Sequence, residues 1–152
     1  MNRIFCQTFA GVVLLIVAGC TPVALTPAQS RPGAAASVKP PKNATTAEQF
    51  DTTSQAERTA ALAPVKPAGE RALGKTIATL GNPTDPGFWL ETTLVNERTQ
   101  GRVVYAPTGK SVAVELIPIQ GAATSGSRIS LPAMRLLGAP LSGLPELTVF
   151  AK

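Results

Sequence analysis

The last part of the chain, about eighty residues, alternates between apolar and polar positions, and this pattern predicts β-strands. The clearest case is a hairpin, in which the runs RVVY (102–105) and SVAVELI (111–117) flank a turn that contains Pro107 and Gly109. Further runs of the same kind are expected to be strands: KTIATLG (75–81), FWLETTLV (88–95) and PELTVFA (145–151). The pattern therefore predicts a mainly β domain over residues 70–152.

One short helix interrupts this β pattern, in the segment RISLPAMRLLGAPL (128–141). Ser130 is a candidate N-cap, and Pro132 falls in the first turn, where its missing N–H costs nothing. Gly138 stands where a left-handed residue can end the helix. We therefore expect one short helix just before the last strand.

A second helical segment is expected upstream of the β domain, within residues 47–63. Thr45 or Thr46 can act as its N-cap with a capping-box residue three positions later, and Pro64 ends it. Large apolar side chains are scarce on this stretch, so the helix is marginal in isolation. The pattern leaves open whether it docks on the β domain or remains a spacer, and residues 64–69 are expected to complete that spacer.

The N-terminal residues resemble the signal peptide of a bacterial lipoprotein. One basic residue precedes IFCQTFAGVVLLIVAG (4–19), an apolar run too short for a typical membrane span. The sequence VAGC (17–20) resembles a lipobox, which implies a signal peptide over residues 1–19 and attachment of fatty acyl chains, such as palmitate, to Cys20. This resemblance implies the periplasmic face of the outer membrane, with the inner membrane left open. The alternative is an uncleaved anchor helix.

Between Cys20 and the first helix lies a segment rich in proline and alanine, residues 21–46. It contains five prolines and no aromatic residue, so it cannot bury enough apolar surface to offset the entropy of ordering. The segment therefore predicts a disordered linker. The formal net charge of the chain is +5, and basic residues in this linker either attract an anionic polymer or lipid surface or simply keep the linker solvated.

Several kinds of chemistry are excluded by composition. The chain has no histidine, so a Ser-His-Asp triad and a histidine-ligated metal are impossible. Its two cysteines, Cys6 and Cys20, leave no disulfide once the signal peptide is removed. We predict no metal and no cofactor.

The tripeptide Gly-Lys-Ser (109–111) raises the question of a nucleotide-binding P-loop. In that motif four residues separate a first glycine from the Gly-Lys pair, and this chain has Val104 at the position of that first glycine. A P-loop also opens a helix, whereas the residues after Lys110 have the pattern of a strand. The sequence therefore favours a hairpin turn, and we predict neither a nucleotide nor a nucleic acid as a partner.

The C-terminal domain resembles rare lipoprotein A and related double-psi β-barrels. The turn TGKSV (108–112) is similar to that family's Asn-Gly-Arg-Ser-Val turn, and GSRISLP (126–132) is similar to the run that precedes its short helix. The resemblance covers residues 75–151 and implies a small six-stranded double-psi-type β-barrel with one short helix.

The chain departs from that family at the positions of its two aspartates. The first falls in IPIQG (117–121) and the second on Ser130, so both carboxylates that the resemblance would imply are absent. Cleavage of a glycosidic bond requires a carboxyl group to protonate the leaving oxygen. The expected domain is therefore a barrel without catalytic residues.

The remaining candidates for a ligand-binding site are aromatic and basic. Trp89 and Tyr105 can stack on sugars, and Arg102 and Arg128 lie on the hairpin and the following loop. The competing interpretation of Trp89, which stands between two apolar residues, is packing in the core or at its rim.

Three functions follow as hypotheses. The first is a non-catalytic lipoprotein, anchored in the membrane by its lipid, whose barrel binds peptidoglycan or another envelope protein. The second is a peptidoglycan lytic transglycosylase with a relocated acid such as Asp85 or Glu91. The third is a sugar-acid (galactarate) dehydratase, against which the lack of histidine and the small domain argue.

Overall fold

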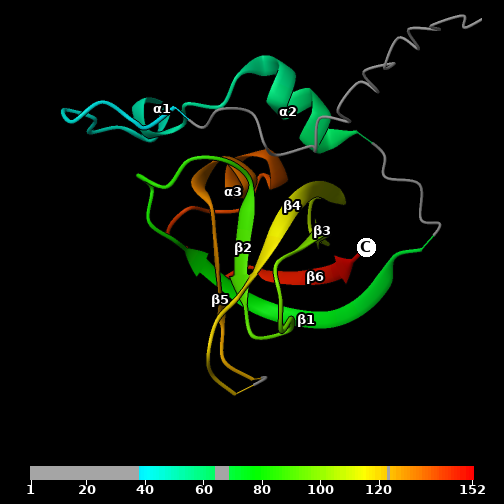
Figure 1. Ribbon diagram of the computed structural model, residues 1–152. Helices are drawn as coiled ribbons and strands as arrows, with labels where there is room; N and C mark the ends of the chain where they lie inside the picture. The colour runs from blue at the N-terminus through cyan, green and yellow to red at the C-terminus, as the bar shows by residue number, and fades with distance from the viewer. Residues whose placement is uncertain (1–37, 64–68, 123) are drawn as a thin grey trace, which may run out of the picture.

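The computed structural model describes residues 38–63, 69–122 and 124–152. The predicted signal peptide, Cys20 and most of the predicted linker lie outside the described residues. The described chain forms nine elements (Figure 1). In chain order they are α1 (Ala47–Phe50), α2 (Gln55–Leu62), β1 (Arg71–Leu80), β2 (Trp89–Thr92), β3 (Thr99–Tyr105), β4 (Lys110–Pro118), β5 (Ser127–Ile129), α3 (Leu131–Leu137) and β6 (Glu146–Ala151).

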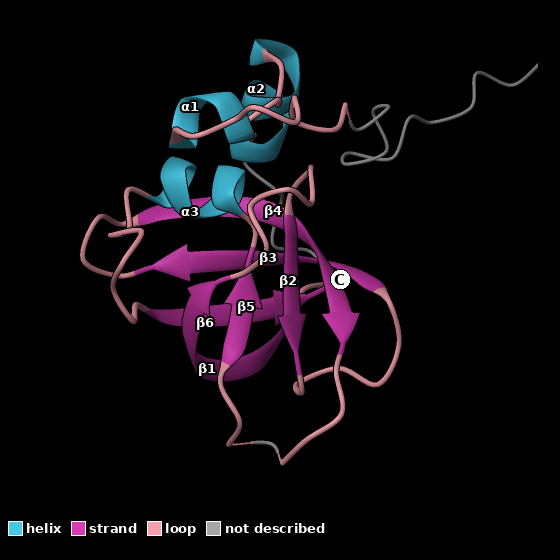
Figure 2. Cartoon of the chain, turned by 90° about the vertical axis from the view of Figure 1, so that its left-hand side faces the viewer, coloured by secondary structure: helices cyan, strands magenta, loops and turns pink. Residues whose placement is uncertain are grey.

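The six strands form a closed barrel, which confirms the expected fold class. Around the barrel the strands follow the order β1-β5-β2-β4-β3-β6, and β6 pairs with β1 to close it. The β1–β5 and β2–β4 pairs are parallel, and the other pairs are antiparallel. The helices gather at one end of this barrel, with α1 and α2 stacked beyond α3 (Figure 2).

The barrel interior is a packed core. Alternate residues of each strand point inward, as in β4, where Val112, Val114 and Leu116 are buried between exposed or half-buried neighbours. Other fully buried apolar side chains come from the remaining strands and from α3: Leu90, Val103, Ile129, Leu131, Met134, Leu137, Leu147 and Val149. Side chains therefore fill the barrel, so its chemistry is confined to the outer surface and the loops.

Gly101 shows how tightly β3 packs against its neighbours. A Cβ at this position would lie 2.5 Å from Leu116 Cδ1 and 2.5 Å from the carbonyl oxygen of Phe150. No side chain fits in that space unless the Leu116 side chain and the backbone of β6 both move.

The hairpin and the short helix form as their sequences predict. Gly109 has a φ of 65° in the turn between β3 and β4, and Gly138 has a φ of 69° at the C-cap of α3. Ser130 stands at the N-cap with extended backbone, but its side chain makes no capping hydrogen bond. Its hydroxyl instead accepts a hydrogen bond from the backbone N–H of Trp89, at 3.2 Å.

The upstream helix is divided into two, where the sequence predicts one. Thr46 and Ser54 each begin a helix with a capping box, and residues 51–54 separate the helices. The side chain of Asp51 accepts hydrogen bonds from the backbone N–H and the hydroxyl of Thr53. Such local bonds compete with helical ones, which explains the break.

The strand expected over residues 88–95 is also shorter than predicted. It ends at Thr92, whose hydroxyl accepts a hydrogen bond from the backbone N–H of Leu94 and so favours a turn. The next strand begins at Thr99, three residues before the predicted start of the hairpin.

Candidate functional site

The four predicted ligand-binding residues do not form one cluster. Trp89 lies on β2 and Arg128 on β5, which are neighbours in the barrel, whereas Arg102 and Tyr105 lie on β3. The pair β2 and β5 is on the opposite side of the six-stranded ring from β3 and β6. The fold therefore separates Trp89 and Arg128 from Arg102.

Trp89 points outward from the barrel but is covered by the loop that precedes β2. Its side-chain N–H donates to the backbone oxygen of Asp85 at 3.3 Å, and a side chain at Gly81 would overlap its ring. The residue is 8% exposed. This position fits packing at the rim of the core, the alternative to sugar stacking.

Arg102 is held in place by Glu70 and Phe150. Its Nε and Nη2 atoms donate to the Glu70 carboxylate at 2.6 to 3.2 Å, and its guanidinium carbon lies 4.4 Å from the centre of the Phe150 ring. The two charged side chains are 18% and 6% exposed. The hydrogen bonds from Arg102 lower the pKa of Glu70, and the charges of Arg102 and Lys152 add to this effect against the opposing effect of burial.

Tyr105 lies at the far end of β3, beside the hairpin turn. It is partly buried and packs against the core. The turn itself is fastened to α3, because the hydroxyl of Thr108 donates to the backbone oxygen of Leu137 at 2.7 Å. Tyr105 therefore belongs to the helical end of the barrel.

A row of four charged side chains, basic at its two ends and acidic in the middle, crosses the face of the barrel that carries Arg128. Arg128 on β5 pairs with Glu91 on β2 at 2.8 Å, and Arg98, just before β3, pairs with Glu115 on β4 at 3.3 Å. We call these four residues the charged ladder. It covers one continuous face, because β5, β2, β4 and β3 are consecutive strands of the barrel.

The two carboxylates of the charged ladder are diagonal neighbours. In the parallel β2–β4 register Trp89 faces Glu115 and Glu91 faces Ile117. Diagonal neighbours on one face are about 7–8 Å apart. Sequence reasoning missed this proximity because it depends on the parallel pairing of two strands that are not consecutive in the chain.

A chain of buried hydroxyl groups joins three strands where β5 begins. Thr76 on β1 and Ser127 on β5 share a hydrogen bond of 2.8 Å, and Ser127 donates to Thr92 on β2 at 2.9 Å. These bonds satisfy polar groups inside the barrel and fasten the β1–β5–β2 region.

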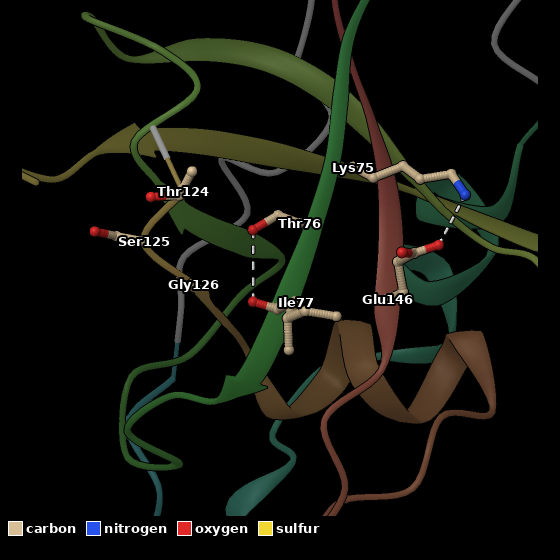
Figure 3. A pocket seen from close by; sticks show the side chains of 7 residues that line it. All are labelled: Lys75, Thr76, Ile77, Thr124, Ser125, Gly126 and Glu146. Carbon is tan, nitrogen blue, oxygen red and sulfur yellow. Dashed lines mark hydrogen bonds and ion pairs between the residues drawn. The ribbon is translucent and has the colours of Figure 1, made fainter. Parts of the chain in front are cut away.

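A surface groove lies beside that region, between β1 and the loop that leads into β5. It is lined by Lys75, Thr76, Ile77, Thr124, Ser125, Gly126 and Glu146 and has a volume of about 270 Å³. In Figure 3, Thr124 and Ser125 lie to one side of β1 and the Lys75–Glu146 ion pair lies to the other. That ion pair spans 2.8 Å and raises the pKa of Lys75, chiefly through its hydrogen bond to Glu146.

Within the ranges 38–63, 69–122 and 124–152, no group of three or more acidic, histidine or cysteine side chains could hold a metal ion. None of the helices in those ranges is long and apolar enough to cross a membrane. Comparison with family models, with curated proteins and with solved structures gives no match.

Proposed function

We propose that this chain is a non-catalytic, lipid-anchored protein of the bacterial cell envelope whose barrel binds peptidoglycan through the charged ladder. The observation that carries the proposal is the ladder itself, an exposed face on which Arg98 and Arg128 flank Glu91 and Glu115. Guanidinium and carboxylate groups in a fixed row can bond sugar hydroxyls and the charged groups of cell-wall peptides. The packed interior directs binding to this outer surface.

The state of the carboxylates supports binding rather than hydrolysis. A general acid needs a pKa raised toward neutrality, as a buried and unpaired carboxyl has. Glu70 is paired with Arg102, whose hydrogen bonds lower the pKa of that carboxyl. Glu91, a candidate for a relocated acid, is paired with Arg128 at 2.8 Å on an open face.

The membrane attachment in this proposal rests on Cys20 and the preceding lipobox-like residues. Several acyl chains on one cysteine would hold the protein firmly, because each buried CH₂ group contributes about 0.8 kcal/mol. Mass spectrometry of the N-terminal peptide from bacterial membranes tests this part directly. We expect the added mass of a lipidated Cys20, and its loss in Cys20→Ser.

The binding test is co-sedimentation of the full chain, purified in detergent, with peptidoglycan sacculi, with released muropeptides measured in the same tube. We expect pelleting without release. The double variant Arg98→Ala/Arg128→Ala should weaken pelleting by about tenfold, the loss of about 1.4 kcal/mol of binding free energy. The matched control Lys110→Ala, an exposed cation outside the ladder, should leave it unchanged.

Each other outcome contradicts a stated part of the proposal. Release of muropeptides would show that the protein is an enzyme. A chain that does not pellet at all would exclude peptidoglycan and favour an envelope protein as the partner. Equal pelleting of the double variant and the wild type would show that the charged ladder is not the binding face.

A further inference from the structure

We infer that the groove beside β1 is a second binding site, which takes a short, extended peptide as an added β-strand, with an acidic and an apolar side chain two residues apart on one face. This site is separate from the charged ladder and goes beyond the proposed function. It uses the backbone of residues 75–77, where β1 has a partner strand on one side only among the described residues.

The strand pairings show this open edge. β1 pairs with β6 from Arg71 to Ile77, but with β5 only from Ala78 to Leu80. β5 itself is three residues long and begins at Ser127. Within the described ranges, the edge of residues 71–77 that faces away from β6 therefore lacks a strand.

The backbone groups of this edge point into the groove. The N–H of Ala78 donates to the backbone oxygen of Pro145 at 3.0 Å, so the Ala78 N–H points to the β6 side. Successive residues of a strand alternate the side to which their N–H and C=O groups point. The N–H groups of Ile77 and Lys75 therefore point away from β6, toward residues 124–126.

The groove is narrow at Gly126. A Cβ at Gly126 would lie 3.1 Å from the backbone oxygen of Ile77, so the loop and β1 approach each other closely there. The backbone N–H of Ser125 is occupied, because it donates to the oxygen of Ala122 at 2.8 Å. The loop thus forms the wall of the groove rather than a seventh strand.

Polypeptide chemistry suits this groove better than a sugar chain. The residues that line it include no aromatic side chain on which a sugar ring could stack. It offers instead backbone donors in the spacing of a β-strand, which a second backbone can satisfy. We therefore assign the occupant as peptide.

The side chains along the edge define the partner further. Lys75 lines the groove together with Glu146, its ion-pair partner, and Arg71 is exposed on the same strand outside the groove. The Lys75 ammonium has three N–H donors and Glu146 takes one of them, so Lys75 can also bind an acidic side chain of the added strand. Ile77, which is 44% exposed, offers an apolar contact two residues further along the same face.

A second copy of this chain is a poorer occupant. Pairing of two such edges would bring exposed cations of both chains together, and like charges on neighbouring strands are destabilising. The bulge between Ala72 and Gly74 also bends the edge away before Lys75. The usable edge is therefore short, and we expect a dissociation constant on the order of tens of micromolar.

The test measures binding of fluorescein-labelled octapeptides to the full chain in detergent by fluorescence anisotropy. The probe repeats Glu-Thr-Val-Thr, which places glutamate and valine in turn on one face of an extended strand. One control contains the same residues in blocks, another replaces each glutamate with lysine, and a third is the probe with alternate amides N-methylated. We expect binding of the probe and a loss of at least tenfold for all three controls.

The matching protein variant is Ile77→Pro. Proline removes the N–H that points into the groove, and it is tolerated at an edge because the bonds to β6 are made by other residues. Ile77→Thr keeps that N–H and serves as the control. Ile77→Pro should weaken binding at least tenfold, and Ile77→Thr by less than threefold, with thermal unfolding confirming that both are folded.

If Ile77→Pro does not fold, the N-methylated peptide still tests the backbone pairing from the other side. Equal binding of the probe and its N-methylated form would overturn the inference, as would failure of the probe to bind. Self-association of the wild-type chain that Ile77→Pro abolishes would show that a second copy is the occupant instead. Sacculus pelleting that persists without peptide binding would leave the proposed function standing and remove this site alone.

Discussion

Asp51 joins the two upstream helices to the barrel, and its removal should release them without unfolding the rest. Its side chain is 2% exposed, accepts a hydrogen bond from Arg135 on α3 at 2.9 Å and forms an ion pair with Arg58 on α2 at 3.2 Å. Thr53 donates to the same carboxylate at 2.5 Å. Asp51→Ala leaves Arg135, Arg58 and Thr53 without this carboxylate.

The structure sets the size of the effect. Removing one partner of a fully buried ion pair costs about 3–5 kcal/mol, but both arginine side chains are about one-third exposed and regain water. We therefore expect a loss of about 2–3 kcal/mol in the docking free energy, which corresponds to a 30- to 150-fold increase in local opening. Apolar packing of α2 does little to replace the lost ion pairs, because the buried residue of α2 is the small side chain of Ala61.

Hydrogen exchange followed by mass spectrometry measures this opening directly. Amides in residues 47–62 should lose protection in Asp51→Ala, while those of the barrel strands should keep it. Glu48→Gln is the matched control, since Glu48 contacts the same Arg135 at 3.4 Å but is 72% exposed, and should change protection by less than about 0.5 kcal/mol. Unchanged exchange in Asp51→Ala would refute the electrostatic account of docking.

Two further predictions concern the barrel. Arg102→Ala should lower the free energy of unfolding by about 2–4 kcal/mol at pH 7, measured by urea denaturation. Because folding lowers the pKa of Glu70, the stabilisation by the Arg102–Glu70 pair is complete above pH 4.5, the ordinary pKa of a glutamate, and is lost as the pH falls through the lowered pKa. A variant that is equally destabilised at every pH would contradict this account. Gly101→Ala should lower the free energy of unfolding by about 3 kcal/mol in the same assay. Gly109→Ala, where a Cβ meets nothing within 4 Å, should lower it by about 1 kcal/mol. Similar losses in the two variants would show that β3 can shift.

Local patterns in the sequence predict the hairpin and α3 well. The turn around Gly109 and the cap at Gly138 depend on neighbours within a few residues, so they can be recognised without the tertiary fold. β5 is different. Its three residues carry too short a pattern to identify, and it exists as a strand because it pairs with β1 and β2.

The candidate sites depend even more on distant pairing. Trp89 was a candidate for stacking, and its cover by Gly81 and Asp85 comes from the path of a loop that no periodicity describes. Arg102 on β3 pairs with Glu70, which precedes β1, because β6 brings these two strands onto one face of the barrel. The residue types that carry chemistry can be read from the sequence, whereas their partners follow from topology.

The shortness of β5 links the closed fold to the inferred peptide site. A barrel must pair every strand on both sides to remove its edges. Here β5 closes the barrel against the last three residues of β1 and leaves residues 71–77 paired with β6 alone among the described residues. The Thr76–Ser127–Thr92 hydroxyl chain fastens the strands where that closure begins. The same three residues that complete the barrel therefore leave an edge beside it, in a position where a rigid scaffold can present it to a partner.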